Sequence, residues 1–326
     1  MYVNKKSNQR IMKNVIYKLV LQLLFGLYTA VAWTQQAPQF TQYMYNTQTI
    51  NPGYTGSRGV MGISAFHRSQ WAGIDGAPET QSLTLGTPVG ENVGLGLSVV
   101  NDRIGNGTNS TTDFGVDFSY AIRTSKEAKL SFGLNAGARL INTDFNNLRF
   151  FQPNFNGNAL ASTDQNFAPN LGVGAYYYTS NFYMGLSVPR VLTTDSFDLG
   201  NDSDTFLVQD ALRVYGTIGW VTELAPNWKL KPAILVNTAN GEPLNVDLSA
   251  NFRYDEKLVL GASYRWAASV SLLTAFQFTD QILIGLAYDR ETTALGGLQF
   301  NDGSFEVFLR YELPFANGKL INARFF

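Results

Sequence analysis

The feature that most constrains this chain is an alternation of apolar and polar residues with a period of two, clearest in residues 242–290. The first row there alternates Leu244, Val246, Leu248, Ala250, Phe252 and Tyr254 with Asn245, Asp247, Ser249, Asn251 and Arg253. Three further rows follow, each after a short turn. Period two indicates β-strands that have one apolar face and one polar face.

The length of the segments and the residue types at their ends indicate whether the apolar face packs in a protein core or contacts lipid. Each segment is about ten residues long, which is near the tilted length needed to cross a bilayer. Aromatic residues collect toward the segment ends, as they do at both interfaces of a membrane barrel. They are Phe252, Tyr254, Tyr264, Trp266, Phe276, Phe278 and Tyr288. We therefore interpret these segments as membrane-spanning strands of a closed barrel.

The same pattern predicts about 14 strands over residues 58–313. The expected strands are 58–68, 79–87, 92–102, 110–123, 128–143, 170–178, 182–190, 211–222, 228–237, 244–254, 257–267, 270–279, 282–290 and 304–313. The predicted fold class is all-β, a transmembrane antiparallel β-barrel, and residues 58–326 form this domain.

The connections between these strands alternate in length. Every connection after an even-numbered strand is brief, whereas the long ones, 144–169, 191–210 and 291–303, follow odd-numbered strands. A bacterial outer-membrane barrel has short periplasmic turns and longer outer loops. The alternation therefore predicts that both termini are periplasmic and that the long loops face outward.

Residues 1–33 have the pattern of a secretory signal peptide. Lys5, Lys6, Arg10, Lys13 and Lys18 precede an apolar core, and Ala30-Val31-Ala32 supplies small residues at cleavage spacing. A membrane anchor is the alternative, but the uncharged core is short for a span. Cleavage would remove basic residues and no acidic ones, so the mature chain is acidic and nothing predicts nucleic-acid binding. The predicted location is the outer membrane.

Residues 34–57 are polar, aromatic and interrupted by proline and glycine, so they predict neither a good helix nor a spanning strand. Three positions remain open for this segment: a plug in the lumen, a periplasmic rim, or a plain leader to the first strand.

Three blocks of sequence stand out near the start of the mature chain: Gln39 to Asn46 (QFTQYMYN), Asn51 to Gly56 (NPGYTG) and Arg68 to Pro78 (RSQWAGIDGAP). Together with the C-terminal residues ARFF, they resemble the PorP/SprF family of Bacteroidetes outer-membrane proteins. The signature residues carried over from the resemblance are Gln39, Phe40, Tyr43, Asn46, Asn51, Pro52 and Gly56.

The resemblance implies a non-enzymatic part in the type IX secretion and gliding machinery. Several family members resemble dedicated partners that help to export a large cell-surface adhesin and hold it at the surface. The implied partners are the outer-membrane bilayer, a large secreted adhesin or other type IX client, and periplasmic secretion or gliding components.

Candidate partner-binding residues come from two expected outward loops. Phe145, Phe150, Phe151 and Phe155 are aromatic residues in the long loop 144–169, where they either pack into the barrel mouth or dock a secreted partner. Arg68, Gln70 and Trp71 are expected to fix the first outward loop by hydrogen bonding and aromatic packing.

Catalysis and metal binding are weaker interpretations. His67-Arg68-Ser69 has the His-x-Ser spacing of some outer-membrane lipid deacylases, but the sequence assigns it no carboxylate partner. There is no cysteine and His67 is the only histidine, so a cysteine or histidine-rich metal site is excluded. The aspartates of loop 191–210 allow a calcium interpretation, but they lack the glycine and terminal glutamate in register, which favours a solvated acidic loop. No cofactor is expected.

An outer-membrane channel, either a porin or a substrate-specific transporter, is the main alternative function. A barrel of about 14 strands encloses a channel unless its lumen is filled. Charged residues in the inward phase could line water or could pair with one another and with the N-terminal segment. They are Arg139, Arg213, Lys229, Lys231, Arg253, Arg265, Glu306, Arg310 and Glu312.

Overall fold

The computed structural model of the chain describes residues 38–144, 163–192, 212–297 and 300–313. The chain divides into two compact units. The larger unit, residues 37–240 and 244–326, is the barrel described below. Of the other unit, the described part is a short turn at residues 241–243, where Gly241 has a φ of +82°.

Within its described residues, the larger unit is built from fifteen strand segments. They are β1 (Met61–Ser69), β2 (Glu79–Val89), β3 (Val93–Ile104), β4 (Asn109–Arg123), β5 (Lys129–Thr143), β6 (Thr163–Tyr178), β7 (Phe182–Val188), β8 (Arg213–Trp220), β9 (Thr222–Ala225), β10 (Trp228–Ala239), β11 (Asn245–Tyr254), β12 (Leu258–Arg265), β13 (Ser269–Gln277), β14 (Ile282–Glu291) and β15 (Ser304–Leu313). The described helical turns are short: η1 (Tyr43–Tyr45), α2 (Thr47–Ile50), η2 (Pro52–Tyr54) and η5 (Ala294–Gly297). Within the described residues, no helix is long and apolar enough to cross a membrane.

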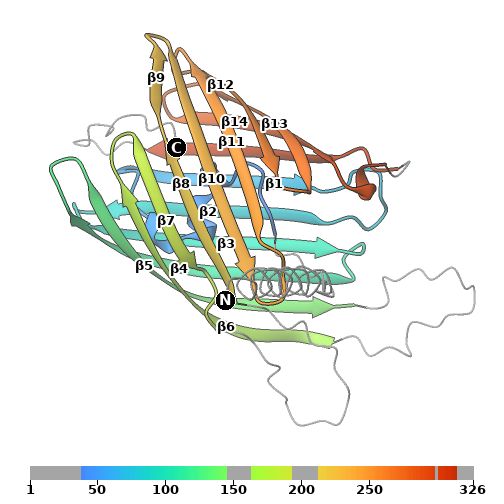
Figure 1. The fold of residues 1–326 in the computed structure, drawn as a ribbon. Coiled ribbons are helices and arrows are strands. Elements are labelled where there is room, and N and C mark those ends of the chain that lie inside the picture. The colour runs from blue at the N-terminus through green and yellow to red at the C-terminus, as the bar shows by residue number, and fades with distance from the viewer. Residues whose placement is uncertain (1–37, 145–162, 193–211, 298–299, 314–326) are drawn as a thin grey trace, which may run out of the picture. The chain divides into compact units, whose positions relative to one another are not determined.

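The strands form one closed antiparallel barrel. Strand β1 pairs with β2 on one side and with β15 on the other, so the first and last strands lie side by side (Figure 1). Strands β8 and β9 both pair with β10, which also pairs with β11. Because β8 and β9 are two parts of one interrupted strand, the fifteen segments make a barrel of fourteen strands, and the predicted fold class is confirmed.

The connections sort to the two ends of the barrel as the sequence predicted. Residues 90–92, 124–128, 179–181, 226–227, 255–257 and 278–281 connect strands at one end, which we call the short-turn end. The longer connections lie at the opposite end, which we call the long-loop end. Strand β1 begins and β15 finishes at the short-turn end.

Two strands differ from their expected bounds. Strand β6 begins at Thr163 rather than at residue 170, because its pairing with β5 continues past Pro169 and absorbs an irregularity between Ile141 and Thr143. Val221 interrupts the expected strand 211–222, where its amide donates to the carbonyl of Asn181 and β9 then continues along β10.

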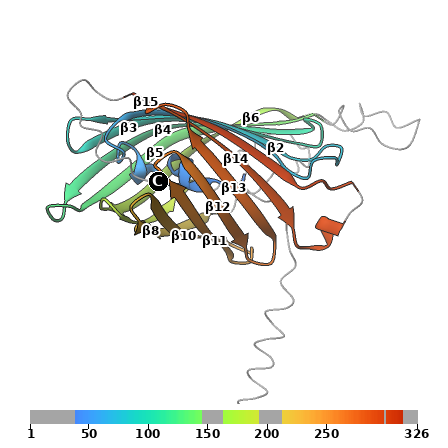
Figure 2. The ribbon, with the colours of Figure 1, turned by 90° about the horizontal axis from the view of Figure 1, so that it is seen from above.

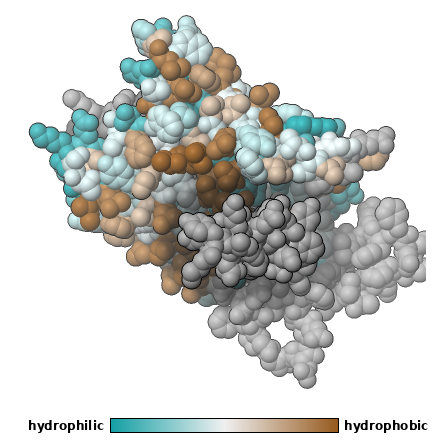
Figure 3. Space-filling model, viewed as in Figure 1, coloured by the Kyte–Doolittle hydropathy of each residue, from teal (hydrophilic) through white to brown (hydrophobic). Residues whose placement is uncertain are grey.

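The polarity of the two strand faces is the reverse of that in a soluble protein. Along β11, Asp247, Ser249 and Asn251 are buried, whereas Leu248 and Phe252 are about 40% exposed. Hydrophobic residues gather over the middle of the face shown in Figure 3, and hydrophilic residues lie mostly toward its margins. Polar residues therefore face the interior and apolar residues face outward, as in a membrane barrel.

Candidate functional site

Residues 38–57, which we call the lumenal segment, lie inside the barrel. Asn46 donates to Ser82 of β2 (3.1 Å), and Asn51 donates to the carbonyl of Ala175 on β6 (3.1 Å). The guanidinium of Arg310 on β15 donates to the carbonyl of Tyr45 (2.5 Å). Because these contacts reach several walls of a closed barrel, the segment occupies its lumen, where Figure 2 shows its blue helical turns between the strands.

A buried ionic cluster holds the start of the lumenal segment. The amides of Thr41 and Gln42 donate to the two carboxylate oxygens of Glu306 at 2.8 and 2.9 Å. The Thr41 hydroxyl donates to Asp289 (2.5 Å) and accepts from Arg68 (2.7 Å). Arg68 also forms ion pairs with Asp289 (2.6 Å) and Glu306 (3.3 Å). We call these residues the lumenal lock.

The lock holds an excess of negative charge in a place that excludes water. One guanidinium faces two carboxylates, and the side chains of all three charged residues are at most 2% exposed. Buried charges are tolerated only where partners and hydrogen bonds replace water. Arg68 alone cannot compensate both buried carboxylates. The backbone amides of Thr41 and Gln42 donate the further hydrogen bonds that Glu306 needs, so the lumenal segment is part of the cluster.

Aromatic packing fixes the same segment against β1 and β15. Tyr45 stacks on Phe308 with ring centroids 4.6 Å apart, and Phe308 stacks on Phe66 at 5.1 Å. Phe40 meets the edge of Phe66 at 5.7 Å. Lys231 of β10 places its ammonium 5.1 Å from the Tyr45 ring centroid, which is within cation–π range.

Glycines in the wall let the second half of the segment approach closely. A Cβ at Gly133 of β5 would overlap the backbone of Pro52 and Gly53, and one at Gly174 of β6 would overlap Asn51. The Asn51 side chain also accepts from the amide of Gly53 (2.8 Å), which starts η2. The barrel wall and the segment are therefore shaped to one another.

All seven signature residues lie in the lumenal segment. Phe40, Tyr43, Asn46, Asn51 and Pro52 are buried, whereas Gln39 and Gly56 are half-buried. Gly56 has a φ of +73°, and a Cβ there would overlap Gly94 of β3. The signature thus describes how the segment fits the lumen.

The candidate partner-binding residues fall in different places. Arg68 points into the lumen and belongs to the lock, whereas the sequence interpretation gave it a role in the first loop. In that loop, residues 70–78, the backbone amide of Gln70 donates to the carbonyl of Pro78 (2.9 Å). Phe145, Phe150, Phe151 and Phe155 lie outside the described residues.

Trp71 connects the first loop by hydrogen bonds to the end of β14 and the start of β15. Its amide donates to the Ser304 hydroxyl and its indole to the Glu291 carboxylate, both at 3.2 Å. Next to it, the Ala72 amide donates to Gly303 (2.7 Å), and the Asp302 amide donates back to Ala72 (2.8 Å). Trp71 adopts a φ of +46°, a conformation that residues other than glycine rarely hold without support from their surroundings.

The loop continues to the connection between β3 and β4. The Gly105 amide donates to the carbonyl of Gly76 (2.8 Å), and Asn106 donates to Asp75 (2.9 Å). Residues 70–78, 105–108 and 291–303, as far as they are described, are therefore joined by hydrogen bonds. We call this group the pinned rim of the long-loop end.

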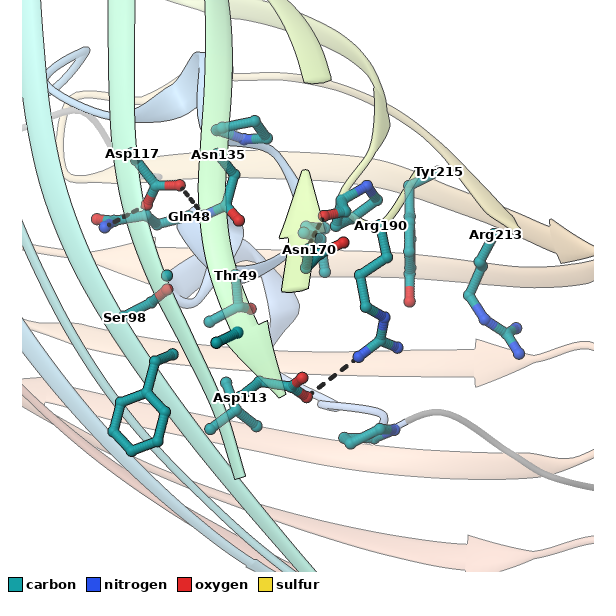
Figure 4. A pocket seen from close by; sticks show the side chains of 18 of the residues that line it. Gln48, Thr49, Ser98, Asp113, Asp117, Asn135, Asn170, Arg190, Arg213 and Tyr215 are labelled. Carbon is teal, nitrogen blue, oxygen red and sulfur yellow. Dashed lines mark hydrogen bonds and ion pairs between the residues drawn. The ribbon is translucent and has the colours of Figure 1, made fainter. Parts of the chain in front are cut away.

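A pocket of about 100 Å³, lined by both apolar and charged side chains, lies beside the lumenal segment toward the long-loop end (Figure 4). Asp113 of β4 binds Arg139 of β5 (2.7 Å) and Arg190 (3.1 Å) on its wall. Deeper in, Asp117 accepts from Asn135 (2.6 Å) and from Gln48 of the lumenal segment (3.0 Å). These contacts link the segment to a second part of the barrel wall, three strands along from the β1 side of the lock.

Three acidic residues of these clusters were missed by the sequence interpretation. Asp113, Asp117 and Asp289 were not among the expected inward charges, although each takes the inward phase of its strand. The period-two alternation could have identified them. Tyr288 is in the outward phase of its strand, so the next residue, Asp289, must face inward. Most of the expected inward charges are buried, among them Arg139, Lys231, Glu306 and Arg310.

A profile of type IX secretion system membrane proteins PorP/SprF matches residues 32–311. A search of curated proteins finds no match. Among solved structures, a Pseudomonas aeruginosa FadL homologue is 11% identical with a TM-score of 0.41, over 87% of this chain and 96% of that one. The Acinetobacter baumannii outer membrane protein Omp33 is also 11% identical, with a TM-score of 0.40, over 78% and 98% of the two chains.

The profile covers both the lumenal segment and nearly all of the barrel. It therefore includes the residues of the segment and the wall residues that contact them. The chain is an outer-membrane barrel, and it belongs to the PorP/SprF family of type IX secretion system membrane proteins.

Proposed function

We propose that this barrel helps the type IX system to export a large cell-surface adhesin and then anchors the adhesin at the surface. The observation that carries the proposal is the filled lumen. The lumenal segment is held by the lock on β1, β14 and β15 and by Asp117 on β4. A barrel whose interior is bonded in this way is suited to present its ends to a partner rather than to pass solutes.

The long-loop end is the surface we assign to the secreted partner. The pinned rim holds Trp71 and Asn106 at positive φ, a conformation that residues other than glycine rarely keep unless surrounding contacts fix it. A rim already fixed in one shape loses little conformational entropy on binding. The aromatic residues Phe145, Phe150, Phe151 and Phe155 of the neighbouring loop belong to the same proposal.

The short-turn end would then face the periplasm, where secretion and gliding components could reach it. This orientation assumes cleavage of residues 1–33 and periplasmic ends for β1 and β15. Short turns on the periplasmic side are the rule for bacterial barrels, which supports the assignment.

A deletion strain tests this function. Without the barrel, we expect the adhesin to disappear from the cell surface and to accumulate inside cells or in the medium, and we expect a plasmid copy to restore it. If surface adhesin is unchanged while uptake of small solutes falls, the barrel serves as a channel instead.

A further inference from the structure

The outer face of the barrel carries an apolar hollow of about 660 Å³ across β12, β13, β14, β15 and β1. Thr274 of β13 lines the hollow between two larger side chains, because it is paired with Leu260 on one side and with Leu286 on the other. Leu272 and Phe305 add to the wall, and both are well exposed. A small side chain between larger outward ones leaves the depression.

The position of the hollow relative to the bilayer follows from its aromatic edge. Tyr288 and Phe305 line it on the side of the long-loop end, with ring centroids 5.1 Å apart. Aromatic side chains on a barrel's outer face mark the membrane–water interface. The hollow therefore extends from that interface into the hydrocarbon of the bilayer, and is continuous with the lipid-facing band of the barrel.

Two polar side chains stand at the same edge. His67 and Ser69 are successive outward residues of β1, opposite Val307 and Phe305 of β15, and both line the hollow. Both can donate hydrogen bonds. Within the described lining there is no lysine or arginine. This chemistry fits a neutral acceptor, such as an ester carbonyl, better than it fits a phosphate.

We propose that the hollow binds a membrane lipid through one ester-linked acyl chain. The chain lies over Thr274 between Leu260 and Leu286, and His67 and Ser69 donate hydrogen bonds to the ester carbonyl at the interface. An apolar cavity with a few converging polar groups is the usual form of a small-molecule site. This site is independent of the proposed role in adhesin export.

Lipid retention tests the proposal. We would purify the full chain from outer membranes in mild detergent, and identify bound lipid by native mass spectrometry and extraction. Thr274→Trp fills the hollow and should lower retained lipid about tenfold or more, which corresponds to ~1.4 kcal/mol. Ala136→Trp places the same side chain on the outer face of β5 and should leave retention unchanged.

A second variant covers the case in which Thr274→Trp does not assemble. The double substitution His67→Leu and Ser69→Ala keeps the hollow open and removes its hydrogen-bond donors, so it should also lower retention. The proposal is overturned if the wild-type barrel carries no lipid, if both variants retain lipid as the wild type does, or if a second copy of the chain covers this face.

Discussion

Arg68 and Asp289 form an ion pair of 2.6 Å in the lumen, and each side chain is only 2% exposed. The pair joins β1 to β14, and the Thr41 hydroxyl bridges its two members. Because Thr41 belongs to the lumenal segment, the barrel wall and its contents share one cluster of charges. A change on either side should therefore affect both.

Removing Arg68 should destabilise the barrel strongly. Arg68→Met leaves the carboxylates of Asp289 and Glu306 buried without their cation, and breaking a buried pair in this way typically costs about 3 to 5 kcal/mol. The free energy of unfolding in detergent micelles measures the effect. As a control, Arg123→Met breaks an exposed pair with Glu91 (4.0 Å) and should cost less than about 1 kcal/mol. Equal losses in the two variants would contradict the assigned role of the lock.

A side chain at Gly133 should displace the lumenal segment. In Gly133→Val the added carbons would overlap Pro52 and Gly53, so we expect ion conductance in planar bilayers to rise above that of the wild type. Gly62→Ala is the matched control, because a Cβ at that inward position meets nothing within 4 Å. If Gly133→Val conducts no better than Gly62→Ala, the segment is not what closes the lumen.

Charge on the outer face should impair assembly in the membrane. Leu248→Arg and Leu286→Arg place a guanidinium among lipid chains, which costs about 2 to 4 kcal/mol at midplane depth. The shift in mobility between heated and unheated samples on detergent gels reports assembly. Unchanged heat-modifiability in both variants would show that the assigned faces are wrong, whereas Leu248→Met should behave as the wild type.

Deletion of residues 150–155 should spare the barrel and weaken retention of the adhesin. These residues lie in the loop between β5 and β6. Surface adhesin is measured on intact cells, and heat-modifiability confirms that the barrel still assembles. An unchanged level of surface adhesin would remove this loop from the interface.

The proposed role of the pinned rim in docking the adhesin can be tested at Trp71, which fixes the loop of residues 70–78. Trp71→Ala removes the indole that donates to Glu291, so the loop should lose its fixed shape and retain less adhesin. Glu79→Ala, at the nearby start of β2, alters an exposed side chain and should have little effect. Equal retention in Trp71→Ala and wild type would place the docking surface elsewhere.

The barrel was predictable because period-two alternation runs along most strands and sets both faces. Leu248 faces outward and Asp247 inward for that reason alone. The extension of β6 to Thr163 was not predictable, because Pro169 and the polar residues before it read as a loop. Pairing with the long strand β5 overrides that local signal.

The site was only partly predictable. The sequence left residues 34–57 three possible positions, since a segment without strand or helix periodicity carries no signal of where it packs. Its burial depends on partners far along the chain, such as Glu306 for Thr41 and Asp117 for Gln48. Arg68 was assigned to the loop because it is the last residue of the expected strand 58–68, and its partner Asp289 lies more than two hundred residues away in the chain.

Capture of the bound partner tests the central claim most directly. The tagged barrel would be isolated from outer membranes in mild detergent, and the proteins that remain bound identified by mass spectrometry. We predict one very large secreted protein, with or without periplasmic secretion components. A barrel that is recovered alone, and that also conducts ions in planar bilayers, would contradict the anchoring role and favour a channel.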